Sequence, residues 1–108
     1  MAGLNCGMPS LLAWPFIKRG FDLFLSISDR HCVQAMRSYY HPLADDPRLI
    51  SGESGAAGLA ALLALVQETS LAPARAHLNL NPGSTVLLLN TEGDTDPEHF
   101  NQVVAQDG

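Results

Sequence analysis

Two short stretches of the sequence hold the side chains whose types and spacing could bind a ligand. The first is SGESGA (Ser51–Ala56), which opens onto a segment rich in alanine and leucine, and the second is NTEGD (Asn90–Asp94), which ends the apolar run Thr85–Asn90. Helix N-termini and the carboxyl ends of parallel strands are the places where α/β proteins bind anionic ligands. Serine is also a favoured helix cap, so spacing alone leaves a ligand loop and a plain cap as alternatives.

The segments that must position these loops alternate between strand and helix patterns. The period-2 pattern FDLFLSI (Phe21–Ile27) predicts a strand, and the continuous apolar run TVLLLN (Thr85–Asn90) predicts a strand buried in a parallel sheet. Helical spacing and end signals predict helices over the following segments: Ser10–Arg19, Ser28 or Asp29 to Tyr40, the Ala/Leu segment up to Val66, Pro73–Leu78, and Pro97–Ala105 with Asp96 as its cap. The predicted fold class is therefore α/β, with parallel strands flanked by helices.

The size of the predicted sheet bears on domain organisation. A chain of 108 residues has room for one domain. Two strands, however, are too few for a sheet that is stable by itself, since three or more are usually needed. Residues 1–108 are therefore interpreted as a single segment of a larger domain.

Charge and hydropathy exclude several classes of protein. Eleven acidic residues against six basic ones give a formal charge of -5, and the bases are scattered except for Lys18 and Arg19, which argues against binding to nucleic acid. No apolar run approaches the roughly 20 residues that span a bilayer. The start of the sequence also lacks the pattern of a secretory signal, so we expect a cytoplasmic protein that is not embedded in a membrane.

Metal sites and disulfides receive little support from the sequence. The histidines lie ten or more residues apart, at His31, His41, His77 and His99, without a metal-ligand spacing. The acidic stretch from Glu92 to Glu98 resembles only part of a calcium loop, and helix capping explains it better. Cys6 and Cys32 fit no Cys-x-x-Cys motif; reduced thiols are the favoured interpretation, and a pairing of the two stays open.

Three blocks of the sequence, taken in order, resemble a known enzyme family. MAGLNCGMPS (Met1–Ser10), DPRLISGESGAAGLAAL (Asp46–Leu62) and LLLNTEGDTDPEHF (Leu87–Phe100) are similar to consecutive blocks near the C-terminal end of diaminopropionate ammonia-lyases. More widely, ESGA (Glu53–Ala56) is similar to a block of threonine dehydratases, within the tryptophan synthase β-like (fold type II) enzymes that use pyridoxal 5'-phosphate.

The resemblance implies a lyase that depends on pyridoxal phosphate and eliminates both amino groups of 2,3-diaminopropionate, giving pyruvate and ammonia. In this family the lysine that carries the cofactor lies far upstream of these blocks, as do the phosphate-binding loop and the carboxylates around the substrate amine. The only lysine in this sequence is Lys18, which we expect to be solvated at the end of a helix. No catalytic residue is therefore carried over, and we expect the 108-residue chain by itself to be inactive and not covalently bound to the cofactor.

What remains is a set of residues that the resemblance implies lie near the cofactor: Thr91, Ser54, Glu53, Gly55 and Asn90. A neutral hydroxyl typically meets the ring nitrogen of the cofactor in this group of lyases. Thr91 is the first candidate because it follows the predicted strand Thr85–Asn90, and Ser54 is the second. The role of Ser54 as a helix cap competes with its role as a cofactor contact.

The expected partners follow from the same resemblance. They are the remainder of the enzyme chain, a second copy in a homodimer, and a small amino-acid substrate. Two alternatives stay open: a fragment similar to a threonine or serine dehydratase, and a truncated remnant without catalytic activity that serves as a folded or partner-binding module.

Overall fold

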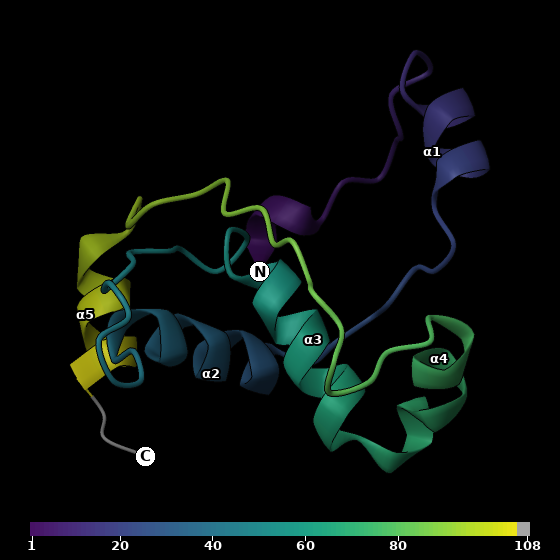
Figure 1. Ribbon diagram of the computed structural model, residues 1–108. Helices are drawn as coiled ribbons and strands as arrows, with labels where there is room; N and C mark the ends of the chain where they lie inside the picture. The colour runs from purple at the N-terminus through teal and green to yellow at the C-terminus, as the bar shows by residue number, and fades with distance from the viewer. Residues whose placement is uncertain (106–108) are drawn as a thin grey trace.

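A computed structural model of the chain describes residues 1–105. Its elements are helical, and Figure 1 shows their arrangement. In chain order they are η1 (Ala2–Leu4), α1 (Trp14–Gly20), α2 (Asp29–Tyr40), α3 (Ala57–Gln67), η2 (Thr69–Leu71), α4 (Ala72–His77) and α5 (Pro97–Ala105).

The helix predictions are confirmed. The bounds of α3 and α4 differ from the predicted ones by a single residue, and the start of α1 differs by four. α2 begins directly after Ser28, and α5 has the predicted bounds, with the Asp96 carboxylate accepting a hydrogen bond from His99 N at 3.1 Å. α1 begins at Trp14 rather than Ser10. The reason is local: the Ser10 hydroxyl binds Ala13 N at 3.2 Å in a turn, and Pro15 falls in the first turn of the helix, where its missing N–H costs nothing.

The α/β prediction is corrected in its strands, because residues 1–105 contain none. Phe21–Ile27 keeps the predicted alternation only in part. Leu23, Leu25 and Ile27 are half-buried and Phe24 is exposed, but Phe21 is also 60% exposed. Thr85–Asn90 is not buried on both faces, since Leu87 is 86% exposed and Leu89 73% exposed. A strand exists only through hydrogen bonds to a neighbouring strand, and neither segment pairs with one in the described part of the chain.

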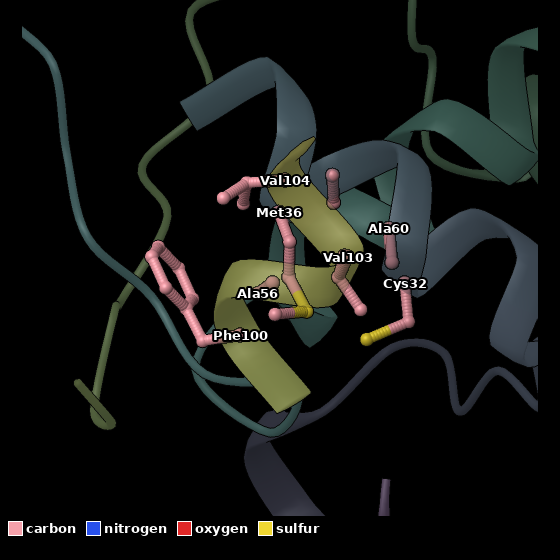
Figure 2. Packing of buried hydrophobic residues seen from close by; sticks show 8 residues of the cluster. Cys32, Met36, Ala56, Ala60, Phe100, Val103 and Val104 are labelled. Carbon is pink, nitrogen blue, oxygen red and sulfur yellow. The ribbon is translucent and has the colours of Figure 1, made fainter. Parts of the chain in front are cut away.

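The core lies where α2, α3 and α5 meet (Figure 2). It is built from eight buried residues: Cys32, Ala35, Met36, Ala56, Ala60, Phe100, Val103 and Val104. Alanines along α3 let it approach α2 closely. Two side chains near the end of α2 also bind carbonyl groups near the end of α5, with Arg37 Nε donating to Val103 O at 2.8 Å and His41 Nε2 lying 3.0 Å from Val104 O.

α1 lies away from this core in Figure 1, and long segments without helix connect it to the rest of the chain on both sides. Its apolar side chains are largely in solvent: Leu11 and Leu12 just before it are each 86% exposed, and Phe16 within it is 77% exposed. Within the described residues, no single helix has the length and apolar character needed to cross a bilayer. α3 and the segment Thr69–His77 meet these criteria only together, as a pair bent by 95°.

Candidate functional site

The two loops singled out from the sequence lie against each other at the N-terminal end of α3. Gly52 N donates to Glu92 O at 3.0 Å, and the buried Ser51 hydroxyl donates to Asn90 Oδ1 at 3.0 Å. The Asn90 amide in turn donates to Ile50 O at 3.0 Å. Stretches about forty residues apart in the sequence thus form one structural unit, which we call the double loop: Ser51–Ala56 together with Asn90–Asp94.

A carboxylate fastens the two halves of the double loop. Glu92 Oε2 accepts hydrogen bonds from Ser54 N at 2.8 Å and from Gly55 N at 3.4 Å, while Glu92 Oε1 accepts one from the Thr95 hydroxyl at 3.1 Å. N–H groups at the start of a helix have no acceptor within the helix and favour an anion. In the sequence, Glu92 belongs to the loop NTEGD and to an acidic stretch, but nothing in its spacing predicts a contact with residues so far away.

Two glycines allow this close approach. A Cβ atom on Gly55 would lie 2.3 Å from Asn90 Oδ1 and 2.7 Å from Glu92 O, and one on Gly52 would lie 2.5 Å from Gly93 O. Neither glycine has a positive φ angle. The requirement for glycine is therefore one of space between the loops rather than of backbone conformation.

The predicted site residues fall into two groups. Gly55 and Asn90 hold the double loop together, as described above. Thr91 and Ser54 carry the candidate hydroxyls: Thr91 is exposed and its hydroxyl has no hydrogen-bond partner among the described residues, whereas Ser54 is half-buried with its Oγ 2.6 Å from where a Cβ on Gly3 would be. Thr91 is thus the more accessible of the two hydroxyls.

Glu53, the remaining predicted residue, points toward α5 and the start of the chain. Its carboxylate lies 2.9 Å from His99 Nε2 and 2.7 Å from the amino group of Met1. The hydrogen bond from that amino group, together with the one from His99, holds the pKa of Glu53 below its ordinary value. No spacing rule connected Glu53 with His99 in the sequence.

A pocket of about 220 Å³ opens between η1, the double loop and the start of α5. Among its lining residues are Gly3, Gly52, Glu53, Ser54, Glu92 and His99. Of the two candidate hydroxyls, the pocket includes Ser54 and not Thr91, which is exposed. The predicted site residues are therefore close in the structure, but they do not all face one cavity.

The two cysteines are not paired with each other, and the single lysine lies apart from the double loop. Cys6 is exposed, Cys32 is buried, and both thiols are free, so the open alternative of a Cys6–Cys32 disulfide is not realised. Burial, with the negative charge of Glu53, raises the pKa of Cys32 to about 11, and its Sγ donates to Glu53 O at 3.1 Å. Lys18 lies in the last turn of α1, which Figure 1 places well apart from the start of α3.

Comparison with known proteins gives a consistent result. No family model matches the chain. The chain is 41% identical over 104 residues to diaminopropionate ammonia-lyase of Escherichia coli strain K12, and 37% identical over 105 residues to the enzyme of Salmonella typhimurium. Each match covers 96% of this chain and 26% of the relative, so the chain spans about a quarter of the length of these relatives.

Solved structures of the Escherichia coli enzyme match in three dimensions as well. The complex with an aminoacrylate-PLP azomethine reaction intermediate superposes with a TM-score of 0.85 at 41% identity, covering 96% of this chain and 28% of that one. The apo form superposes with a TM-score of 0.79 at 39% identity, covering 91% and 27%. This chain is therefore similar to the diaminopropionate ammonia-lyases over nearly all of its own length and corresponds to a segment of about a quarter of theirs.

Proposed function

We propose that this chain is the C-terminal segment of an ammonia-lyase that depends on pyridoxal phosphate and converts 2,3-diaminopropionate into pyruvate and ammonia. The observation that carries the proposal is the 41% identity over 96% of the chain, together with the superposition on the Escherichia coli enzyme at a TM-score of 0.85. In this proposal the segment contributes the double loop to a site whose remaining parts come from the rest of the enzyme.

The residues of the double loop fit a contact with such a cofactor. Gly52 and Gly55 allow the backbones of the two loops to lie close together. The Thr91 hydroxyl is exposed and forms no hydrogen bond with any described residue. Lys18 does not fit as the attachment point, because it lies in the last turn of α1, away from the double loop. We therefore assign this chain a non-covalent contact with the cofactor and assign the covalent one to the remainder of the enzyme.

Pyridoxal phosphate, when bound, supplies an electron sink for bond breaking at the α-carbon of the substrate. The role we assign to Thr91 is to donate a hydrogen bond from its hydroxyl to the ring nitrogen. A neutral hydroxyl leaves the ring nitrogen unprotonated, whereas a carboxylate would favour its protonated form. Ser54 is the second candidate for this contact.

The exposed apolar side chains of this chain support the proposal that the remainder of the enzyme packs against it. Leu87 and Leu89 in Thr85–Asn90 and Phe16 in α1 are more than 70% exposed, although soluble proteins rarely leave large apolar patches uncovered. We propose that both segments pack against the rest of the enzyme, where Thr85–Asn90 and Phe21–Ile27 would join a parallel sheet of fold type II. A homodimer, a small amino-acid substrate and a cytoplasmic location complete the proposal.

A chimeric enzyme tests the proposal. In the Escherichia coli enzyme, the matching segment is replaced by this chain, and pyruvate and ammonia released from 2,3-diaminopropionate are measured. We expect release of both products, with Thr91→Asp shifting the absorbance of the bound cofactor and lowering the elimination rate, since the carboxylate changes the charge state of the ring.

The chimera also separates the alternatives. A chimera that binds the cofactor and acts on threonine or serine but not on 2,3-diaminopropionate would favour the dehydratase interpretation. A soluble chimera that binds the cofactor and converts none of these amino acids would contradict the proposed function. If Ser54→Asp changes absorbance and rate while Thr91→Asp changes neither, the order of the two hydroxyls is reversed.

A further inference from the structure

Glu92 contacts the first loop through its side chain and through its backbone. Its carboxylate accepts the N–H groups of Ser54 and Gly55, and its carbonyl oxygen accepts the N–H of Gly52 at 3.0 Å. These contacts link residues that are 37 to 40 positions apart in the sequence. A surface carboxylate that only improves solubility would make no such set of contacts.

The environment of Glu92 strengthens this link. The side chain is half-buried, and its second oxygen is held by the Thr95 hydroxyl at 3.1 Å. Hydrogen bonds from backbone N–H groups to a charged carboxylate are roughly twice as strong as neutral ones. Glu92 fits tightly against the first loop, since a Cβ atom on Gly52 would lie 2.7 Å from its carboxylate carbon.

Thr91 lies between two anchored residues. Asn90 on one side is held by the Ser51 hydroxyl and by Ile50 O, and Glu92 on the other side is held by the first loop. Thr91 itself has no hydrogen bond to the first loop. Its position is therefore set by its neighbours rather than by contacts of its own.

We propose that Glu92 is a positioning residue, which fixes the loop Asn90–Asp94 on the loop Ser51–Ala56 and thereby sets where the Thr91 hydroxyl stands. The inference rests on the proposed function in so far as Thr91 is assigned the contact with the cofactor. Glu92 itself touches neither substrate nor cofactor in this scheme. Its effect passes through the backbone of residue 91.

Hydrogen exchange tests whether Glu92 holds the two loops together, and it does not require a catalytically active enzyme. The chimeric enzyme is prepared in its cofactor-free form as parent, Glu92→Ala, Glu92→Gln and Glu98→Ala, and exchange is followed by mass spectrometry in peptides covering residues 51–57. Loss of the carboxylate should speed exchange at Ser54 and Gly55 by about tenfold to a hundredfold. Glu92→Gln keeps an acceptor oxygen and should restore most of the protection, and Glu98→Ala removes an exposed carboxylate of α5 as the charge-matched control.

The absorbance of the bound cofactor tests the positioning. Thr91→Val, which removes the hydroxyl and keeps the shape of the side chain, serves as the reference. We expect Glu92→Ala to shift the absorbance in the same direction as Thr91→Val, Glu92→Gln to restore the parent spectrum, and Glu98→Ala to leave it unchanged. A loss of global stability alone would not produce a shifted spectrum in Glu92→Ala together with a parent spectrum in Glu92→Gln.

Each result bears on one of the two proposals. If Glu92→Ala exchanges at the parent rate, the inference is overturned. It is also overturned if Glu92→Ala exchanges faster but keeps the parent spectrum, while Thr91→Val shifts that spectrum. If Thr91→Val leaves the spectrum unchanged, the proposed cofactor contact of Thr91 fails, and exchange alone then decides whether Glu92 fastens the loops.

Discussion

Because the two loops lie in close contact at Gly55, we expect Gly55→Ala to lower the free energy of unfolding. The added Cβ would lie 2.3 Å from Asn90 Oδ1, 2.7 Å from Glu92 O and 2.8 Å from Glu92 N, and each of these distances must increase to at least about 3.0 Å. Two of the three obstructing atoms belong to the backbone, so a change of side-chain rotamer cannot relieve them. The second loop must move away from the first.

The magnitude follows from two opposing effects. Forcing extra volume into a well-packed site costs about 1–3 kcal/mol. Replacing glycine by alanine at a φ angle that alanine can adopt returns about 0.4–1 kcal/mol, because the unfolded chain loses freedom. The net loss in the free energy of unfolding is thus about 1–2 kcal/mol, which at a urea m-value of about 1–3 kcal/mol/M lowers the midpoint by on the order of 1 M.

Urea unfolding of the purified protein, followed by circular dichroism, measures this loss. Gly58→Ala in α3 is the matched control, because its Cβ would meet nothing nearer than Leu88 Cδ2 at 3.5 Å, an ordinary contact. Alanine is a better helix former than glycine by about 1 kcal/mol, so the control should keep or raise the midpoint. A Gly55→Ala midpoint equal to or above that of the parent would refute the close packing of the two loops.

Three further predictions concern other parts of the chain. Cys32 should resist a thiol reagent at pH 8, because its pKa is raised to about 11 and the thiol stays protonated, while the exposed Cys6 reacts at once; a count of two fast thiols in the folded protein would contradict this. Borohydride reduction of the 108-residue chain with pyridoxal phosphate should give no stoichiometric adduct at Lys18, and a mapped adduct there would defeat the prediction. Asp96→Ala should lower the free energy of unfolding by about 0.5–2 kcal/mol through loss of the cap of α5, and an unchanged urea midpoint would count against that cap.

The sequence by itself determined the helices and where most of them begin and end. Helical spacing in α2 and the signal of Asp96 before Pro97 at α5 are local features, and the structure confirms both. The apolar alternation of Phe21–Ile27 also reappears as alternating burial from Leu23 to Ile27, although Phe21 is 60% exposed. The resemblance of three sequence blocks to diaminopropionate ammonia-lyases also agrees with the comparison, which finds 41% identity over 96% of the chain.

Only the tertiary structure decided how the site is assembled. The apolar character of Thr85–Asn90 predicted a buried strand, but a strand requires a partner, and residues 1–105 supply none. The pairing of Glu92 with Ser54 and of Glu53 with His99 depends on how α3 and α5 pack against α2, which brings together loops that no local pattern relates. Residue types can name the candidates for a site, whereas the distances between them are set by the packing of the whole chain.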